Sequence, residues 1–286
     1  MPKQTELIVL SLLLALLLFG CTSSAPIPSA SSTPTPTITP TLIPTASTPA
    51  PSTATIPSAT PTAQPTAPSD TVQPQLLKSL PLDLASIDWK KVNAHRNLYE
   101  SGLPISDYGH LDAAGTANER RNPQPTFFAP LGTPVLAPVD GVVAEVKVLY
   151  SGDWTIMYGT QTGHNDATWE TEHVIDVLVK PGDVVKAGQQ VASVSDYVCT
   201  YSKKQYGNDE YCGTGIGLTE LGYLVGGNPP QHFCPFGELT DPVALPGIEA
   251  ALAGARQEIN QLAGKDLFNT SKWSAPNCIV TDPVSG

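Results

Sequence analysis

Two apolar stretches interrupted by glycine and proline limit most strongly what this chain can fold into. They span residues 129–150 and 172–196. In each, valines and other apolar residues gather in short runs between turn-forming residues, a pattern that predicts strand, tight turn, strand. From Ala144 to Tyr150, apolar and more polar residues mostly alternate. This alternation predicts a half-buried strand with one solvated face.

The second stretch carries a recognisable turn. Ile175, Val177 and Val179 fall on one predicted strand face just before Lys180–Asp183. In that turn proline presets φ at the first central position, and Gly182 supplies the conformational freedom that the second central position needs. We expect the two stretches to form two halves of one barrel or sandwich.

These residues carry a family resemblance. The sequence GTPVLAPVDGVV, followed later by VKPGDVVKAGQQVA, resembles the core of the LytM and lysostaphin-type zinc metallopeptidases. More broadly, it resembles the duplicated hybrid motif shared by biotinyl and lipoyl domains. The resemblance covers residues 122–245. It implies a mainly β fold, a barrel-sandwich of the duplicated hybrid motif, to which we add a helix near the C-terminus.

In the resembling peptidases, zinc is held by the His and Asp of an HxxxD motif and by the second His of an HxH motif. Three protein ligands leave a fourth position for a water molecule that ionises near neutral pH. The resemblance places Asn122 and Thr126 at the first two ligand positions. The closing motif corresponds to IGLTEL, in which Ile216 and Leu218 replace both histidines and Glu220 preserves the ending.

One histidine of the family's set remains. His173, in TEHVIDVLVKPGD, stands where the family has a histidine that assists the attacking water. The alternative is a structural histidine, satisfied by a backbone carbonyl or by Glu170 or Glu172. We therefore expect no zinc at the inherited site.

A rearranged zinc site is a second possibility. His110 and Asp112 lie two residues apart and can point the same way on an extended segment, and further candidates lie in polar loops: His164, Asp166 and His232. Such a site requires the ligands to meet around one point together with His173. Loop pairs of this kind are usually solvated or cap turns instead.

The N-terminus predicts export. Residues 1–20 contain an apolar stretch too short to span a bilayer comfortably, which is typical of a signal peptide. Leu18 to Cys21 resembles a bacterial lipobox, which implies lipidation of Cys21 and anchoring at the extracytoplasmic face of the cell membrane. The alternative is an ordinary signal peptide with an incidental cysteine.

Residues 21–74 are composed almost entirely of Ser, Thr, Pro and Ala. Such a segment cannot bury enough apolar surface to offset its chain entropy, so it predicts a disordered stalk. Residues 22–69 contain no charged side chain and Lys3 and Glu6 cancel, so the net charge of −11 belongs to residues 70–286. An acidic domain lacks the basic footprint that nucleic acids or anionic lipids require.

Four cysteines remain beyond the anchor, an even number that predicts two disulfides in an exported domain. Proximity favours Cys199 with Cys212, closing a polar loop, and Cys234 with Cys278, pinning the C-terminal tail. Because no Cys/His metal spacing occurs, a structural zinc site is the weaker alternative.

The rest of the chain surrounds the predicted β domain. Residues 75–121 form an N-terminal extension, with a short helix suggested by the spacing of Trp89 and Val92 and an irregular loop over 105–125. Residues 246–286 hold a helix and the tail. That helix shows a narrow apolar stripe from Ile248 to Leu262, with Gly264 as its stop.

Three functions fit these features. The first is a non-catalytic domain on a lipid-anchored stalk that binds cell-wall peptidoglycan or a partner protein, with no cofactor. The second is a zinc endopeptidase that cleaves peptidoglycan peptides through the rearranged ligands. The third is a hybrid-motif adaptor of export machinery. The β turn lacks a modifiable lysine flanked by methionine, which argues against this third function. We favour the first.

Overall fold

The computed structural model describes residues 75–98, 101–112, 114–117, 119–159, 167–207, 209 and 212–286. They belong to one compact unit, Pro68–Gly286. The predicted signal peptide and the whole predicted stalk, including Cys21, lie outside the described residues, as do His164 and Asp166. Within the described residues, no helix is both long and apolar enough to cross a membrane.

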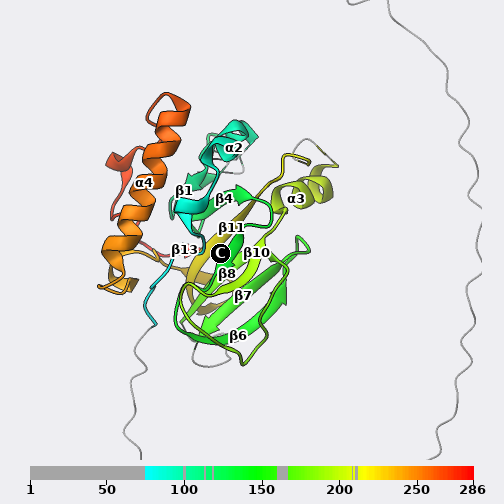
Figure 1. The fold of residues 1–286 in the computed structure, drawn as a ribbon, viewed down its shortest axis with the longest axis vertical. Coiled ribbons are helices and arrows are strands. Elements are labelled where there is room, and N and C mark those ends of the chain that lie inside the picture. The colour runs from blue at the N-terminus through cyan, green and yellow to red at the C-terminus, as the bar shows by residue number, and fades with distance from the viewer. Residues whose placement is uncertain are drawn as a thin grey trace, which may run out of the picture. The chain divides into compact units, whose positions relative to one another are not determined.

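An antiparallel sheet forms the body of the domain (Figure 1). Its main path runs β1 (Ile105–Ser106), β4 (Thr126–Pro130), β11 (Ile216–Gly227), β8 (Thr168–Ile175), β7 (Trp154–Gly159), β6 (Gly141–Val148) and β9 (Val184–Val185). Off this path, β10 (Gln190–Val194) pairs with β5 (Pro134–Leu136) and β8, and β12 (Pro230–His232) pairs with β11 and β13 (Val284–Ser285). A separate hairpin consists of β2 (Leu111–Asp112) and β3 (Arg120–Arg121).

The mainly β fold predicted from the sequence is confirmed. Residues far apart in the chain meet on three adjacent strands, since Glu220 of β11 pairs with Thr126 of β4 on one side and with Glu172 of β8 on the other. The hydrophobic core lies against these strands, and its largest fully buried side chains include Phe127, Ile156, Tyr158, Trp169 and Leu221.

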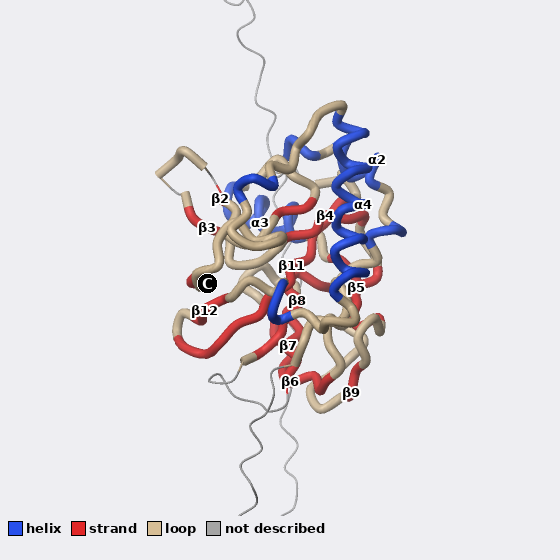
Figure 2. The backbone as a smooth tube through the Cα atoms, turned by 90° about the vertical axis from the view of Figure 1, so that its left-hand side faces the viewer, coloured by secondary structure: helices blue, strands red, loops and turns tan. Residues whose placement is uncertain are grey.

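The helices are η1 (Leu84–Ser86), α2 (Trp89–Ala94), η2 (Arg96–Leu98), α3 (Tyr197–Tyr206), η3 (Gly237–Leu239), α4 (Leu245–Ala263) and η4 (Thr270–Lys272). The predicted C-terminal helix is confirmed as α4, which ends at Gly264 in the left-handed conformation (φ 66°). Its apolar stripe is buried from Ile248 to Ile259, whereas Leu262 is exposed. The predicted short helix is α2, and Figures 1 and 2 show it beside α4.

Both predicted disulfides are present, Cys199–Cys212 and Cys234–Cys278. The second bond joins the tail to the domain, and β13 adds the end of the tail to the sheet beside β12. Tyr108 strengthens this attachment, because its hydroxyl donates to the carbonyl of His232 at 2.8 Å and accepts from the backbone N–H of Val284 at 3.0 Å.

Three local predictions need correction. The loop expected over residues 105–125 contains the short strands β1, β2 and β3, whose backbone groups pair. The segment closed by Cys199–Cys212 is largely the helix α3 rather than a polar loop. The alternation predicted from Ala144 to Tyr150 also fails at its end, because Val148 and Tyr150 are 49% and 62% exposed. At the start of this segment, the pairing of β6 with β7 changes register between Val143 and Glu145.

Candidate functional site

The candidate site lies where β4, β8 and β11 run side by side. Glu220 is at its centre, because its Oε1 accepts hydrogen bonds from Thr126 Oγ1 at 2.8 Å and from Asn122 Nδ2 at 3.3 Å. Asn122 Nδ2 also lies 3.5 Å from Thr126 Oγ1. The two residues that correspond to the family's first ligands therefore meet in space, and both donate to a carboxylate.

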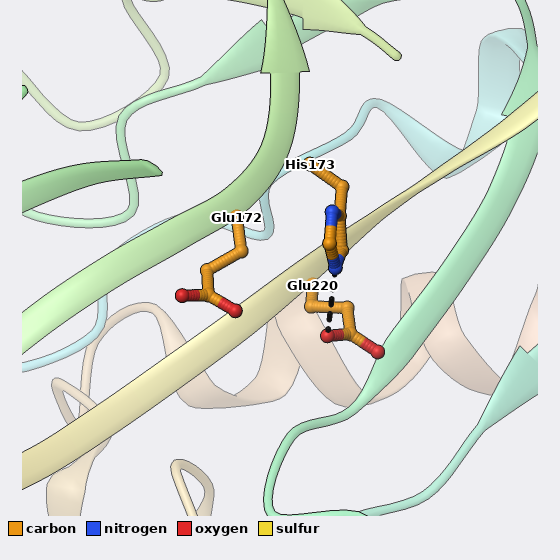
Figure 3. Close-up of side chains that lie close together, drawn as sticks. All are labelled: Glu172, His173 and Glu220. Carbon is orange, nitrogen blue, oxygen red and sulfur yellow. Dashed lines mark ion pairs between the residues drawn. The ribbon is translucent and has the colours of Figure 1, made fainter. Parts of the chain in front are cut away.

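His173 enters the site through a bulge in β8. Glu172 and His173 together lie opposite the single residue Thr155 of β7, and His173 has a left-handed φ of 55°. Successive residues on a regular strand point to opposite faces, and a bulge removes this alternation locally. As a result, both side chains lie near Glu220, and the ring of His173 points toward its carboxylate (Figure 3).

The ring of His173 is held from three sides and is only 3% exposed. Its Nδ1 lies 3.0 Å from Asp153 Oδ2, its Nε2 lies 3.7 Å from Glu220 Oε2, and its face stacks on Tyr197 at 3.6 Å between centroids. For a structural histidine, the sequence predicts a backbone carbonyl, Glu170 or Glu172 as the partner. The structure corrects this, because the hydrogen-bonded partner is Asp153.

Asp153 is itself held by two serine hydroxyls. Ser195 Oγ donates to its Oδ2 at 2.6 Å and Ser151 Oγ donates to its Oδ1. Burial opposes the charge, but the hydrogen bond and charge of His173 outweigh it and lower the pKa of Asp153. Burial likewise acts against a charged His173 ring, yet the carboxylates of Asp153, Glu220 and Glu172 raise the pKa of His173.

Two further glutamates border the site on β8. Burial, reinforced by the charge of Glu220, raises the pKa of Glu170 to about 8. Burial and the charge of Glu170 raise the pKa of Glu172 to about 8. Glu170 is hydrogen-bonded by Gln124 Nε2 at 2.7 Å. Room for its side chain comes from Gly222 on the adjacent strand, because a Cβ at that position would overlap Glu170.

The candidates for a rearranged zinc site are dispersed into separate pairs. His110 Nε2 lies 2.8 Å from Asp112 Oδ1, and His232 Nε2 lies 3.0 Å from Glu170 Oε1. Burial lowers the pKa of His232, so we assign this contact to a neutral ring that donates to the carboxylate. His110, Asp112 and His232 are all buried rather than solvated. His232 is on β12 rather than in a loop.

The structure points to a different potential ligand set. Among the described residues, the group whose side-chain atoms lie close enough to hold a metal ion is Glu172, His173 and Glu220, with all three ligand atoms within 4.8 Å of one another. The sequence pattern predicted His173 and Glu220, indicated Glu172 only as a possible hydrogen-bond partner of His173, and gave no indication of Asp153. The segment WETEH carried a signal, because two glutamates alternate with other residues on a strand that is otherwise buried.

The family's zinc ion does not fit the residues at its inherited positions. Asn122 and Thr126 are neutral and are engaged with Glu220, and Leu218 is a buried apolar residue of the core. Zinc requires imidazole, thiolate or carboxylate donors. Ile216, at the second assisting position, is also part of the core.

Comparison with known proteins supports the predicted family resemblance. Residues 125–205 match the model of peptidase family M23. The predicted resemblance to these peptidases is thereby confirmed for this part of the chain, which includes β4, β8 and His173. Asn122, Ile216, Leu218 and Glu220 lie outside the matched residues. A comparison with curated proteins found no match.

Several solved structures of M23-type peptidases are similar to the chain. One is a mutant catalytic domain of the prophage-encoded M23 protein EnpA from Enterococcus faecalis, with 24% identity, a TM-score of 0.33, and coverage of 47% of this chain and 92% of that one. The antimicrobial peptidase lysostaphin from Staphylococcus simulans has 20% identity, a TM-score of 0.35, and coverage of 63% and 56%. A zinc-containing peptidase from Vibrio cholerae has 19% identity, a TM-score of 0.34, and coverage of 58% and 40%.

Proposed function

We propose that this domain has lost the hydrolytic activity of the M23 peptidases and serves as a binding module of the bacterial cell envelope. One observation carries the proposal. Asn122 and Thr126, at the positions of two zinc ligands, both donate to Glu220 Oε1. A neutral amide and a neutral hydroxyl bonded to a carboxylate form a satisfied network in the absence of a metal.

Most of the remaining catalytic machinery of the family is also lacking. Hydrolysis in these enzymes needs an open metal position for water and a group that assists the attack. Leu218 and Ile216 supply neither function. His173 is the one assisting residue that remains, and it is bound to Asp153 and stacked on Tyr197. The rearranged alternative is disfavoured, since His110 and His232 are each paired with a different carboxylate.

We propose cell-wall peptidoglycan as the ligand, by analogy with the family, with a partner protein of the envelope as the competing choice. The full chain is expected to sediment with purified, insoluble peptidoglycan. Glu220→Ala removes the centre of the site and is expected to reduce the bound fraction, whereas Glu249→Ala, on the exposed surface of α4, is the matched control. Failure to sediment, or equal loss in both variants, would argue for a partner protein or for another surface.

The leader suggests where the module works. We propose that Cys21 is acylated and holds the protein at the extracytoplasmic face of the cell membrane. Because acyl chains bind through burial of apolar surface, detergent is expected to release the protein and high salt is not. Cys21→Ser is expected to leave the protein unprocessed or shed. Release of the unsubstituted protein by salt alone would contradict this proposal.

A further inference from the structure

The buried carboxylates in and near the site differ in their partners. Asp112, Asp153 and Glu170 each have a histidine nitrogen within about 3 Å. Glu172 has neither a hydrogen bond nor an ion pair through its side chain to another described residue, although it pairs across the strands with Glu220. Two carboxylates placed directly opposite each other on adjacent strands repel when both are ionised. A bound cation would relieve that repulsion.

The second and independent observation is the orientation of His173. Its Nδ1 is occupied by Asp153, so when a cation displaces the second ring proton, the lone pair of Nε2 is directed toward Glu220. Nε2 has no hydrogen bond among the described residues, because its distance of 3.7 Å to Glu220 Oε2 is too long for one. A carboxylate on the far ring nitrogen is the usual outer partner of a metal-bound histidine.

We propose that His173 Nε2 and the carboxylates of Glu172 and Glu220 form a site for a divalent cation, with Asp153 as the positioning residue. The bulge in β8 and the left-handed φ of His173 place both β8 ligands on the side of Glu220 (Figure 3). A tetrahedral ion with bonds of about 2.1 Å separates its ligands by about 3.4 Å. The distance of 3.7 Å between His173 Nε2 and Glu220 Oε2 is close to this value, and all three ligand atoms, including that of Glu172, lie within 4.8 Å of one another.

One nitrogen and two oxygen donors indicate the class of ion. Calcium and magnesium prefer all-oxygen sites, whereas zinc and manganese accept imidazole together with carboxylate. We assign the site to zinc, because its affinity for such mixed sites exceeds that of manganese.

This site is not the inherited one, since Asn122, Thr126 and Leu218 supply none of its donors. The proposal of this site also does not depend on whether the domain binds peptidoglycan. With His173 used as a ligand and Ile216 at the other assisting position, no histidine of the family's set is left to activate water. The proposed ion therefore holds β8 and β11 together without restoring hydrolysis.

The test measures zinc binding to the full chain after chelator treatment, by titration calorimetry and elemental analysis. We expect one zinc ion per chain, with calcium and magnesium at least about tenfold weaker. Glu172→Gln and Glu220→Gln are expected to weaken zinc binding by about 100-fold or more, and Asp153→Asn by about 10- to 100-fold. Glu249→Gln, which removes one exposed carboxylate from α4, is expected to bind zinc normally.

A second measurement tests the proposal even if the variants fail to fold. On the unsubstituted protein, NMR spectroscopy of the histidine side chains should show zinc-dependent shifts at His173 Nε2, with smaller changes at His110 and His232. The proposal is overturned if no zinc binds, if Glu172→Gln and Glu220→Gln bind zinc as well as Glu249→Gln does, or if the largest shifts occur at another histidine.

Discussion

Replacing Gly217 by alanine is expected to destabilise the domain by about 3 kcal/mol or more. A Cβ at this position would overlap the carbonyl oxygen of Ser195 and lie 2.8 Å from Leu131 Cδ2. Leu131 can rotate away, but the backbone of Ser195 is held, because its N–H donates to the carbonyl of His173 at 3.1 Å and its carbonyl accepts from Leu218 N–H at 3.3 Å. Urea denaturation followed by circular dichroism measures the loss.

The matched control is Gly254→Ala on α4. A Cβ there meets no atom within 4 Å outside the helix's own backbone, and alanine is favoured over glycine within a helix by up to about 1 kcal/mol. Gly254→Ala is therefore expected to be neutral or stabilising. Similar unfolding midpoints for the two variants would contradict the close packing of β11 on the backbone of Ser195. They would also argue against a fixed position for Ser195, whose hydroxyl donates to Asp153.

Arg256→Ala is expected to cost about 3–5 kcal/mol of folding free energy, the usual range when one partner of a buried ion pair is removed. Its guanidinium donates to Asp107 Oδ1 at 2.5 Å and to Asn277 Oδ1 at 2.6 Å. The same group lies over the ring of Trp273, 4.8 Å from its centroid. Removal leaves Asp107 buried with only the indole N–H of Trp273 as a side-chain donor among the described residues, so α4 and the tail should loosen together.

Arg120→Ala provides the comparison for this prediction. Arg120 also contacts a carboxylate, Asp112 at 3.3 Å, but its side chain is 66% exposed. Because the Arg120 guanidinium is solvated and Asp112 keeps His110 as a partner at 2.8 Å, we expect a loss of about 1 kcal/mol or less. Thermal unfolding of both variants under identical conditions measures the difference. Equal destabilisation would mean that the buried Arg256 network does not hold the tail.

Much of the fold was predictable because its signals are local. The turn at Lys180–Asp183 rests on Pro181 and on Gly182, which has a φ of 91°. The C-terminal helix follows from apolar spacing and a stop glycine, and proximity of the cysteines gave both disulfides. Each of these patterns depends on residues that are close in sequence, or on a small number of possible pairings.

The candidate site was less predictable because its contacts are not local. Asp153 and His173 are twenty residues apart, and Asn122 and Glu220 are ninety-eight apart. No pattern in a single sequence specifies the bulge that turns Glu172 and His173 to the same side. The pairs that His110, His173 and His232 form with carboxylates likewise depend on which strands are adjacent. The sequence spacing therefore suggested one common metal site, whereas the structure has three separate histidine–carboxylate pairs.

Dye release from labelled, insoluble peptidoglycan tests the central claim most directly, because it asks whether the domain still hydrolyses the substrate expected for the family. The full chain should release no more dye than buffer does, without added metal and with zinc at saturation, since Asn122, Thr126 and Leu218 cannot hold the catalytic ion. Release that requires zinc, stops with a chelator and is lost in both His173→Ala and Glu220→Gln would contradict the claim and identify the domain as a peptidase with displaced ligands.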